Sequence, residues 1–304
     1  MCRVARFMLT CQTDHTRDRC PCCLNELTGG LDNWHHVCNS CGYESAALDN
    51  RINVEAAALC EVAREDGLRT LRQDNFKELM GMISARLTMQ SPALLEVGCG
   101  HGWFLELAAR RFATVGIEPD HRMFLKLQDK GLNVIEGYFP DALNPTEKFD
   151  AIVFNDVLEH IADPEAALKA CLSVFKKDGV LVLNLPTSAG LFYRMAKIGK
   201  QLGLGGAFER MWQKDFPSPH LHYFSAPNLK LLLQRCGFNV KSCASLPSIR
   251  LSGLYSRIAY ADSTRKWRHV LLWFALVISY PLVRWFTSDI MVVLASADGA
   301  DREF

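Results

Sequence analysis

The chain has 304 residues, of which 34 are basic and 33 acidic, giving a net charge of +1, and 49% are hydrophobic. This length accommodates one α/β domain and a small accessory module, and the composition excludes extensive disorder. A net charge near zero gives no sign of the broad positive field with which proteins track a phosphate backbone, so composition does not suggest a nucleic acid partner.

The cysteine content and the N-terminus together indicate the compartment. The chain contains 12 cysteines, which in a small secreted protein would suggest disulfide bonds. The N-terminus lacks the uninterrupted apolar segment of a secretory signal, because Arg3 and Arg6 interrupt the only candidate. We therefore expect a cytoplasmic protein, in which clustered cysteines favour metal binding.

Residues 1–48 are expected to form a zinc ribbon behind an irregular tail. Cys20 and Cys23 form one CxxC pair, and Cys38 and Cys41 form another after 14 intervening residues. A segment this short buries too little apolar surface to fold alone, whereas structural zinc supplies roughly 10–16 kcal/mol in comparable modules. Four thiolates leave no open position for water, so we expect structural zinc. An unliganded or redox-active cluster is the alternative.

Residues 49–90 are expected to form a helical linker. Apolar side chains recur there at steps of three and four residues and make one apolar face, namely Phe76, Leu79, Met80, Ile83 and Leu87. The Ser91-Pro92 pair ends the helix. From residue 91 to the C-terminus we expect one α/β domain.

A glycine-rich turn follows the first strand of this domain. Residues 93–97 are an apolar run that predicts a strand, and residues 98–102 carry glycines ahead of a helix, which lets a ligand approach the backbone closely. The dinucleotide fingerprint is not matched, because Gly102 follows Gly100 by two residues and Trp103 occupies a position kept small there. The GK[ST] ending of a phosphate loop is also missing. The loop therefore favours neither a nicotinamide cofactor nor a nucleoside triphosphate.

This loop resembles the first motif of the class I S-adenosylmethionine (SAM)-dependent methyltransferases, which is an acidic residue, one spacer and G-x-G-x-G. The matching residues are Glu96, Gly98, Gly100 and Gly102. The resemblance implies the doubly wound α/β fold of that family, with a seven-stranded, mostly parallel sheet, and it implies SAM as the cofactor. Cys99 within the loop is expected at the same site.

The second and third strands supply further expected cofactor contacts. Residues 114–117 predict a strand that ends at Glu118, and the acid at this position in the resembled family accepts hydrogen bonds from both ribose hydroxyls. A carboxylate suits two donors because it has two acceptor oxygens. We expect Pro119 beside it. After the third strand the family's usual acid for the adenine amino group is missing, so a backbone group or the rings of Tyr138 and Phe139 are expected to replace it.

The fourth strand is expected at residues 149–154, and a second motif follows it. Residues 156–164 resemble the D-V-L-E-H-x-x-D-P signature of the small-molecule branch of the family, which includes quinone-biosynthesis methyltransferases. Asn155 and Asp156 lie where open α/β sheets bind ligands, so we expect both at the cofactor site. The N/D-P-P-Y/F tetrapeptide of enzymes that methylate base amines is absent here, which favours a hydroxyl or a carbon acid as the acceptor.

The acceptor side carries three histidines that could act as the base. A helix is expected over 164–177 and a fifth strand over 179–186, and the H-L-H-Y-F-S stretch that begins at His220 resembles one that covers the substrate side in the same branch. Methyl transfer to a hydroxyl is an in-line displacement that also requires removal of a proton, which suits a histidine near neutral pKa. His160, His220 and His222 are the candidates, and a packing role is the alternative for each.

Residues 250–288 form a hydrophobic insertion, most apolar at 270–283. A helix of that apolar length spans ~21 Å, short of the ~30 Å hydrocarbon layer. Residues 289–295 are also expected to return to the sheet beside a strand at 239–246, which a single crossing would prevent. We expect residues 265–286 either to lie at the inner face of a membrane, with basic and tryptophan side chains at the headgroups, or to pack against the domain or a partner.

These features favour a methyltransferase that uses SAM to modify an oxygen, or as second choice a carbon, of a small-molecule, sugar or lipid-linked acceptor. Two alternatives stay open. One is an RNA methyltransferase that grips its substrate with the ribbon, although no basic, aromatic-interleaved strip is present. The other is a SAM-binding interaction protein without catalysis, against which the intact glycine loop and Glu118 argue.

Overall fold

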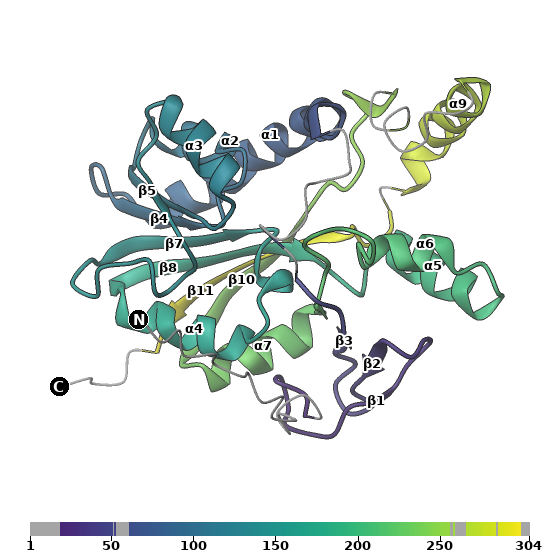
Figure 1. The fold of residues 1–304 in the computed structure, drawn as a ribbon, viewed down its shortest axis with the longest axis horizontal. Helices are drawn as coiled ribbons and strands as arrows, with labels where there is room; N and C mark the ends of the chain where they lie inside the picture. Colours follow the sequence, from purple (N-terminus) through teal and green to yellow (C-terminus); the bar gives the residue numbers. More distant parts are fainter. Residues whose placement is uncertain are drawn as a thin grey trace, which may run out of the picture.

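The computed structural model describes residues 19–50, 52, 61–255, 258, 266–283 and 285–298. The tail before residue 19, most of the expected linker before residue 61 and part of the expected insertion at 250–288 lie outside the described residues. The described residues form a twisted central sheet with helices on both faces and a smaller sheet beside it (Figure 1).

The central sheet has the architecture that the sequence predicts. Its strands are β4 (Ala93–Val97), β5 (Ala113–Glu118), β6 (Val134–Glu136), β7 (Phe149–Asn155), β8 (Phe175–Pro186), β10 (Phe238–Leu246) and β11 (Ile290–Ala297). Their spatial order is β10-β11-β8-β7-β4-β5-β6, and β11 alone among them runs antiparallel to the parallel set that it joins at β8. The chain winds outward in both directions from β4. Such a reversal places a ligand crevice at the carboxyl ends of β4 and β7.

Helices cover both faces of this sheet, so its central strands are buried on both sides. One face is covered by α1 (Glu61–Arg86), α2 (Trp103–Ala108) and α3 (His121–Asp129), and the other by α4 (Pro164–Ser173) and α7 (Ala226–Arg235) (Figure 1). The apolar face predicted for the linker helix is the one that α1 buries, with Leu79 and Ile83 fully inaccessible. Every residue of β7 is buried, as a central parallel strand requires.

The boundary between α4 and β8 differs from the prediction. The helix ends at Ser173 instead of residue 177, and the strand begins at Phe175 instead of residue 179. The reason is tertiary, because the Phe175 backbone pairs with Phe149 of β7 and its ring packs edge-on against Phe238, with 5.6 Å between the centroids. These contacts outweigh the helical preference of the two lysines that follow.

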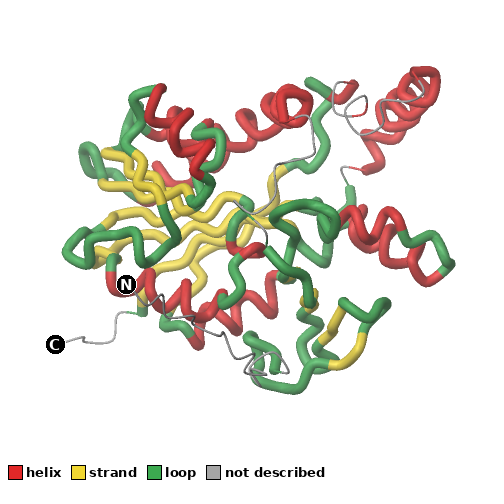
Figure 2. Tube along the Cα trace, viewed as in Figure 1, coloured by secondary structure: helices red, strands yellow, loops and turns green. Residues whose placement is uncertain are grey.

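The N-terminal segment shares a sheet with a distant part of the chain. Its strands β1 (Thr28–Gly29), β2 (His35–Val37) and β3 (Glu44–Ala46) are joined by β9 (His222–Tyr223), which pairs with β3 (Figure 2). Two helices, α5 (Leu191–Gln201) and α6 (Gly206–Met211), complete this region. Trp34 packs there in one apolar cluster with Phe208 and Trp212. The cysteine segment is therefore docked on the rest of the protein by both backbone pairing and an aromatic core.

The apolar run near the C-terminus forms α9 (Lys266–Val283), which lies at the periphery of the molecule (Figure 1). Much of its apolar surface is not covered by the described residues, since Ile278 is 77% exposed and Leu271 59% exposed. None of the helices within the described ranges combines the length and apolarity that a membrane crossing requires.

Candidate functional site

A cavity of about 420 Å³ lies at the carboxyl ends of β4, β5 and β7. Both its place and its size are those of a small-molecule site in an open α/β sheet. Most residues expected at the cofactor site line it, namely Glu96, Gly98, Cys99, Gly100, Glu118, Pro119, Asn155 and Asp156. Among the expected bases, His160 and His220 also line it. Gly102, Tyr138, Phe139 and His222 lie outside the lining.

The glycine turn after β4 depends on left-handed backbone conformations. Gly98 has φ +66° and Gly100 has φ +50°, a region that side chains with a Cβ rarely adopt. A Cβ at Gly98 would also lie 2.7 Å from the Val157 side chain. Gly102, with φ +74°, serves packing instead of cavity lining, because a Cβ there would lie 2.5 Å from the Leu127 side chain.

Glu118 points into this turn. It is 6% exposed at the end of β5, and its Oε2 accepts a hydrogen bond of 2.7 Å from the Gly100 N–H. Its Oε1 accepts one of 2.9 Å from the Asp120 N–H. Burial raises the pKa of Glu118. Each carboxylate oxygen keeps a second lone pair, so two hydroxyl donors can still be accepted at this place.

Glu96 places a second buried carboxyl at the cavity. Its Oε1 accepts a hydrogen bond of 2.9 Å from Asn155 Nδ2, while its Oε2 has no hydrogen-bond partner among the described residues. Burial, with a smaller contribution from the charge of Glu118, raises the pKa of Glu96 to about 8. A buried carboxylate that is only half satisfied favours a ligand that brings positive charge or a donor.

The opposite wall contains Glu159 and His160 in the 3₁₀ turn η2 (Leu158–His160). Glu159 is fully buried, neither carboxyl oxygen has a hydrogen-bond partner among the described residues, and burial raises its pKa well above the ordinary value. His160 Nδ1 is 2.7 Å from the Pro219 carbonyl oxygen and must donate to it. The acceptor lone pair of a neutral His160 therefore lies on Nε2, which is 3.9 Å from Glu159 Oε1.

The other two histidines are held by packing and hydrogen bonds. His220 Nε2 is 2.8 Å from the Gln213 amide nitrogen, and its Nδ1 is 3.3 Å from the Tyr223 hydroxyl, whose own proton goes to the Met211 carbonyl oxygen. His222 donates from Nε2 to the Ile161 carbonyl oxygen at 2.8 Å, so its Nδ1 accepts from the Tyr43 hydroxyl. Burial lowers the pKa of His222 to about 4. These contacts fit the alternative in which His222 has a packing role and is not the base.

The two aromatic residues expected at the adenine lie away from the cavity lining. Tyr138 is 57% exposed, and the Phe139 ring packs edge-on against Phe154 inside the core, with 5.9 Å between centroids. Neither ring lines the cavity. The sequence pattern located the third strand correctly but not the direction of the side chains that follow it.

Two clusters bring metal-ligating atoms together. The Sγ atoms of Cys20, Cys23, Cys38 and Cys41 all lie within 4.8 Å of one another, as the predicted ribbon requires. Cys22 is buried beside them and is not in the set, as expected for the spare cysteine. Within the cavity, ligand atoms of Glu159, His160 and His220 also lie within 4.8 Å of one another, so these side chains could hold a cation.

The cavity also has a wall that motif reasoning missed. Leu68, Arg72 and Phe76 of α1 line it, although the sequence indicated only a linker helix there. The Arg72 guanidinium lies 2.9 Å from the Asp156 carboxylate, and Asp156 has φ +53°. No local pattern reveals this pair, because its members are far apart in the sequence and meet only when α1 packs over the sheet.

Residues 70–242 match a family described as "Methyltransferase domain". The mitochondrial ubiquinone biosynthesis O-methyltransferase of Bos taurus is 27% identical over 175 residues, covering 53% of this chain and 45% of that protein. The ubiquinone biosynthesis O-methyltransferase of Salmonella paratyphi A is 30% identical over 116 residues, covering 36% of this chain and 48% of that protein. The chain thus spans about half the length of the curated relatives it matches.

A solved structure of similar fold is an S-adenosylmethionine-dependent methyltransferase from Clostridium acetobutylicum. It superposes with a TM-score of 0.51 at 11% identity and covers 79% of this chain and 98% of that one. At this identity the likeness concerns the fold alone.

Proposed function

Because the chain belongs to the methyltransferase-domain family, we propose that it transfers the methyl group of SAM to an oxygen of a small-molecule, sugar or lipid-linked acceptor. The observation that carries the proposal is the orientation of Glu118, whose carboxylate meets the backbone N–H of Gly100 inside the cavity. Similarity to ubiquinone O-methyltransferases supports oxygen over carbon.

The half of the cavity formed by Glu96, the glycine turn and Glu118, which we call the cofactor half, carries groups whose chemistry suits SAM. Glu118 offers acceptor oxygens for the ribose hydroxyls, and the left-handed turn at Gly98 and Gly100 leaves room for a ligand against the backbone. Glu96 contributes a carboxyl that a cationic ligand stabilises. Bound SAM supplies an electrophilic methyl group on a sulfonium centre.

The half of the cavity formed by Glu159, His160 and the segment 213–220, which we call the acceptor half, is suited to removing the proton of a hydroxyl. His160 lines the cavity with Nδ1 committed to the Pro219 carbonyl oxygen, which fixes the ring and leaves Nε2 as the basic nitrogen. Glu159 lies beside it, with Oε1 3.9 Å from Nε2, so a proton on Nε2 and the ionised form of Glu159 would stabilise each other. Among the three histidines, His160 is therefore our choice for the base.

The test is incorporation of labelled methyl groups from SAM into cell extracts that have been fractionated as RNA, lipids and small metabolites. Label in the lipid or small-metabolite fraction supports the proposal. Label in RNA would favour the alternative in which the ribbon grips RNA, and no label in any fraction would favour a SAM-binding protein without catalysis. Incorporation must be lost in the Glu118→Ala variant, which serves as the site control.

The cysteine cluster is proposed to hold a structural zinc ion through Cys20, Cys23, Cys38 and Cys41. Metal analysis of the purified protein should find about one zinc per chain. Cys38→Ser should lower this content, whereas Cys22→Ser, which removes the neighbouring spare thiol, should not. Equal zinc loss in both variants would contradict the assignment of ligands.

The apolar helix α9 is proposed to contact a membrane surface at its cytoplasmic face, which would suit a lipid-linked acceptor. Its exposed apolar side chains include Trp267, Phe274 and Ile278. Residues 264–288 contain four basic and no acidic side chains, which complements anionic headgroups better than an average protein surface does. Flotation with vesicles of anionic lipid should carry the protein upward, and indifference to such vesicles would favour a protein partner instead.

A further inference from the structure

The acceptor half of the cavity is connected to the cysteine ribbon by direct contacts. The backbone of β3 pairs with β9, and the Ala46 N–H donates to the Leu221 carbonyl oxygen at 2.9 Å. The Leu221 N–H in turn donates to the Glu159 carbonyl oxygen at 2.7 Å. Leu221, directly before β9, is thus bonded both to the ribbon and to the turn that carries Glu159 and His160.

A side-chain connection runs parallel to this backbone connection. The Tyr43 hydroxyl, two residues after a metal-ligating position, donates to His222 Nδ1. His222 Nε2 donates at 2.8 Å to the carbonyl oxygen of Ile161, the residue directly after His160. Both rings are buried, so water does not compete for these bonds. The position of Ile161 therefore depends on a residue of the ribbon.

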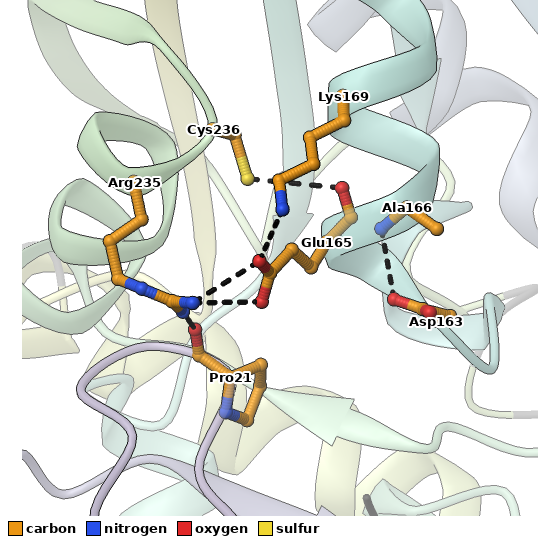
Figure 3. Close-up of polar contacts among 7 residues, drawn as sticks. All are labelled: Pro21, Asp163, Glu165, Ala166, Lys169, Arg235 and Cys236. Carbon is orange, nitrogen blue, oxygen red and sulfur yellow. Dashed lines mark hydrogen bonds and ion pairs between the residues drawn. The ribbon is translucent and has the colours of Figure 1, made fainter.

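Both metal-binding turns are also bound to α7. Figure 3 shows Arg235 donating to the Pro21 carbonyl oxygen, between two of the clustered cysteines, and to both oxygens of the Glu165 carboxylate at 3.1 Å. Glu165 lies in the first turn of α4, directly after the loop that contains His160. At the other turn, Asn228 Nδ2 donates to the Cys41 carbonyl oxygen at 3.3 Å. The loop at 159–163 is thus connected to the ribbon at both of its ends.

A fourth contact joins the ribbon to the helices beyond the cavity. Glu44 is buried and accepts from His35 Nε2 at 2.8 Å, the Tyr193 hydroxyl at 2.9 Å and Lys197 Nζ at 2.7 Å. The first donor belongs to the ribbon, and the other two belong to α5. A buried carboxylate with three donors, one of them a lysine, is costly to separate, because each group would be left unsatisfied.

We infer that the ribbon is a structural support of the acceptor half of the cavity, and that the metal in it holds Glu159 and His160 in place through Tyr43, His222 and Arg235. The inference rests on the proposed function in two respects, the zinc in the ribbon and the name "acceptor half". Tyr43, His222 and Arg235 act as positioning residues, since none of them lines the cavity. The glycine turn takes no part in these contacts. It directly follows β4 and is held by the hydrogen bond from the Gly100 N–H to Glu118.

The test is hydrogen exchange measured by mass spectrometry on the full chain, with zinc bound and after removal by a chelator, together with calorimetric titration of S-adenosylhomocysteine. Zinc removal should speed exchange at least tenfold in residues 19–48, 158–163 and 219–224. Exchange in residues 93–118 should change less than twofold, and the affinity for S-adenosylhomocysteine less than threefold.

Tyr43→Phe separates positioning from a general loss of structure. The variant should retain its zinc and its exchange pattern at residues 19–41, yet exchange faster at 158–163 and 219–224. The matched control is Tyr255→Phe, which removes the hydroxyl of a tyrosine that is 44% exposed, and it should leave the exchange pattern unchanged.

Two results would overturn the inference. Faster exchange confined to residues 19–48 after zinc removal would make the ribbon independent of the cavity. Faster exchange throughout the central sheet, with loss of S-adenosylhomocysteine binding, would make it a support of the whole fold. Zinc-bound protein that does not bind S-adenosylhomocysteine would contradict the proposed function instead, and the exchange pattern would still decide the inference.

Discussion

The two halves of the cavity are built in different ways. The cofactor half comes mainly from one continuous stretch, residues 96–120, in which two adjacent parallel strands and the glycine turn after the first place Glu96, Gly100 and Glu118 together, with Asn155 of β7 bonded to Glu96. The acceptor half is assembled from η2, the segment 213–220, helix α1 and, behind them, the ribbon. The conformation of the first half depends mainly on residues close together in the sequence, whereas that of the second depends on contacts between distant parts of the chain.

The difference predicts that variants in the acceptor half change the rate but not the binding of the cofactor. His160→Ala should lower methyl transfer by about 10²- to 10⁴-fold, the usual contribution of a general base. Its affinity for S-adenosylhomocysteine should stay close to that of the parent protein. Rates of transfer and calorimetric titration measure the two quantities.

The matched control for this variant is His121→Ala, because His121 is an exposed histidine of α3 outside the cavity lining. It should leave the rate unchanged. A His160→Ala variant that transfers methyl groups at the parent rate would remove His160 from the proposed mechanism and would leave the acceptor half without an assigned base.

A second prediction concerns the dependence of the acceptor half on pH. Burial lowers the pKa of His222 to about 4, below the value of about 6.5 expected in the unfolded chain. Between these values the unfolded state binds a proton that the folded state does not. The free energy of unfolding should therefore fall as the pH drops from 6.5 toward 4, by about 3 kcal/mol at most.

Urea unfolding of the parent protein and of His222→Gln at pH 7.5 and pH 5 measures this dependence. Glutamine does not titrate, so the variant should lose less stability than the parent between the two pH values. Zinc content is measured in both proteins at each pH, so that loss of metal is not mistaken for this effect. Equal losses in the two proteins would show that His222 is not buried as a neutral ring.

A third and smaller effect is expected in the cofactor half. Burial raises the pKa of Glu96 to about 8, so this carboxyl is largely protonated in the ligand-free protein near neutral pH. A positively charged ligand favours its ionised form. Affinity for SAM should therefore rise between pH 6 and pH 7.5, by at most about tenfold per pH unit. In Glu96→Gln the affinity for SAM should not change over this pH range. Calorimetry at each pH measures it, and a rise that persists in the variant would contradict the role of Glu96.

The sequence predicted which residues of the local half line the cavity, because its signals lie within one short stretch. The glycine spacing, the acid Glu96 and the strand that ends at Glu118 are all readable in order, and their register follows from adjacent parallel strands. The seven-stranded fold is equally readable, since buried strands appear as continuous apolar runs. The clustering of Cys20, Cys23, Cys38 and Cys41 was predicted for the same reason, from spacing alone.

The non-local half was predicted only in part. His160 and His220 were found through a motif, but the sequence does not show that His222 faces Tyr43 or that Arg72 meets Asp156. Both pairs form across long sequence separations and depend on how the ribbon and α1 pack. The exposed position of Tyr138 was missed because a three-residue strand gives too short a pattern to fix which side chains face inward.

The local half of the cavity is proposed to bind SAM through Glu118. Calorimetric titration of S-adenosylhomocysteine into the parent protein and Glu118→Ala tests it, with Glu136→Ala as the control because Glu136 pairs with Glu118 on the neighbouring strand yet lies outside the cavity. The parent and the control should bind with similar affinity, and Glu118→Ala should bind about 100-fold more weakly, the loss expected for charged hydrogen bonds. Parent protein without measurable binding would show that the cavity does not bind this cofactor, and a Glu118→Ala variant that binds as tightly would show that Glu118 does not hold it.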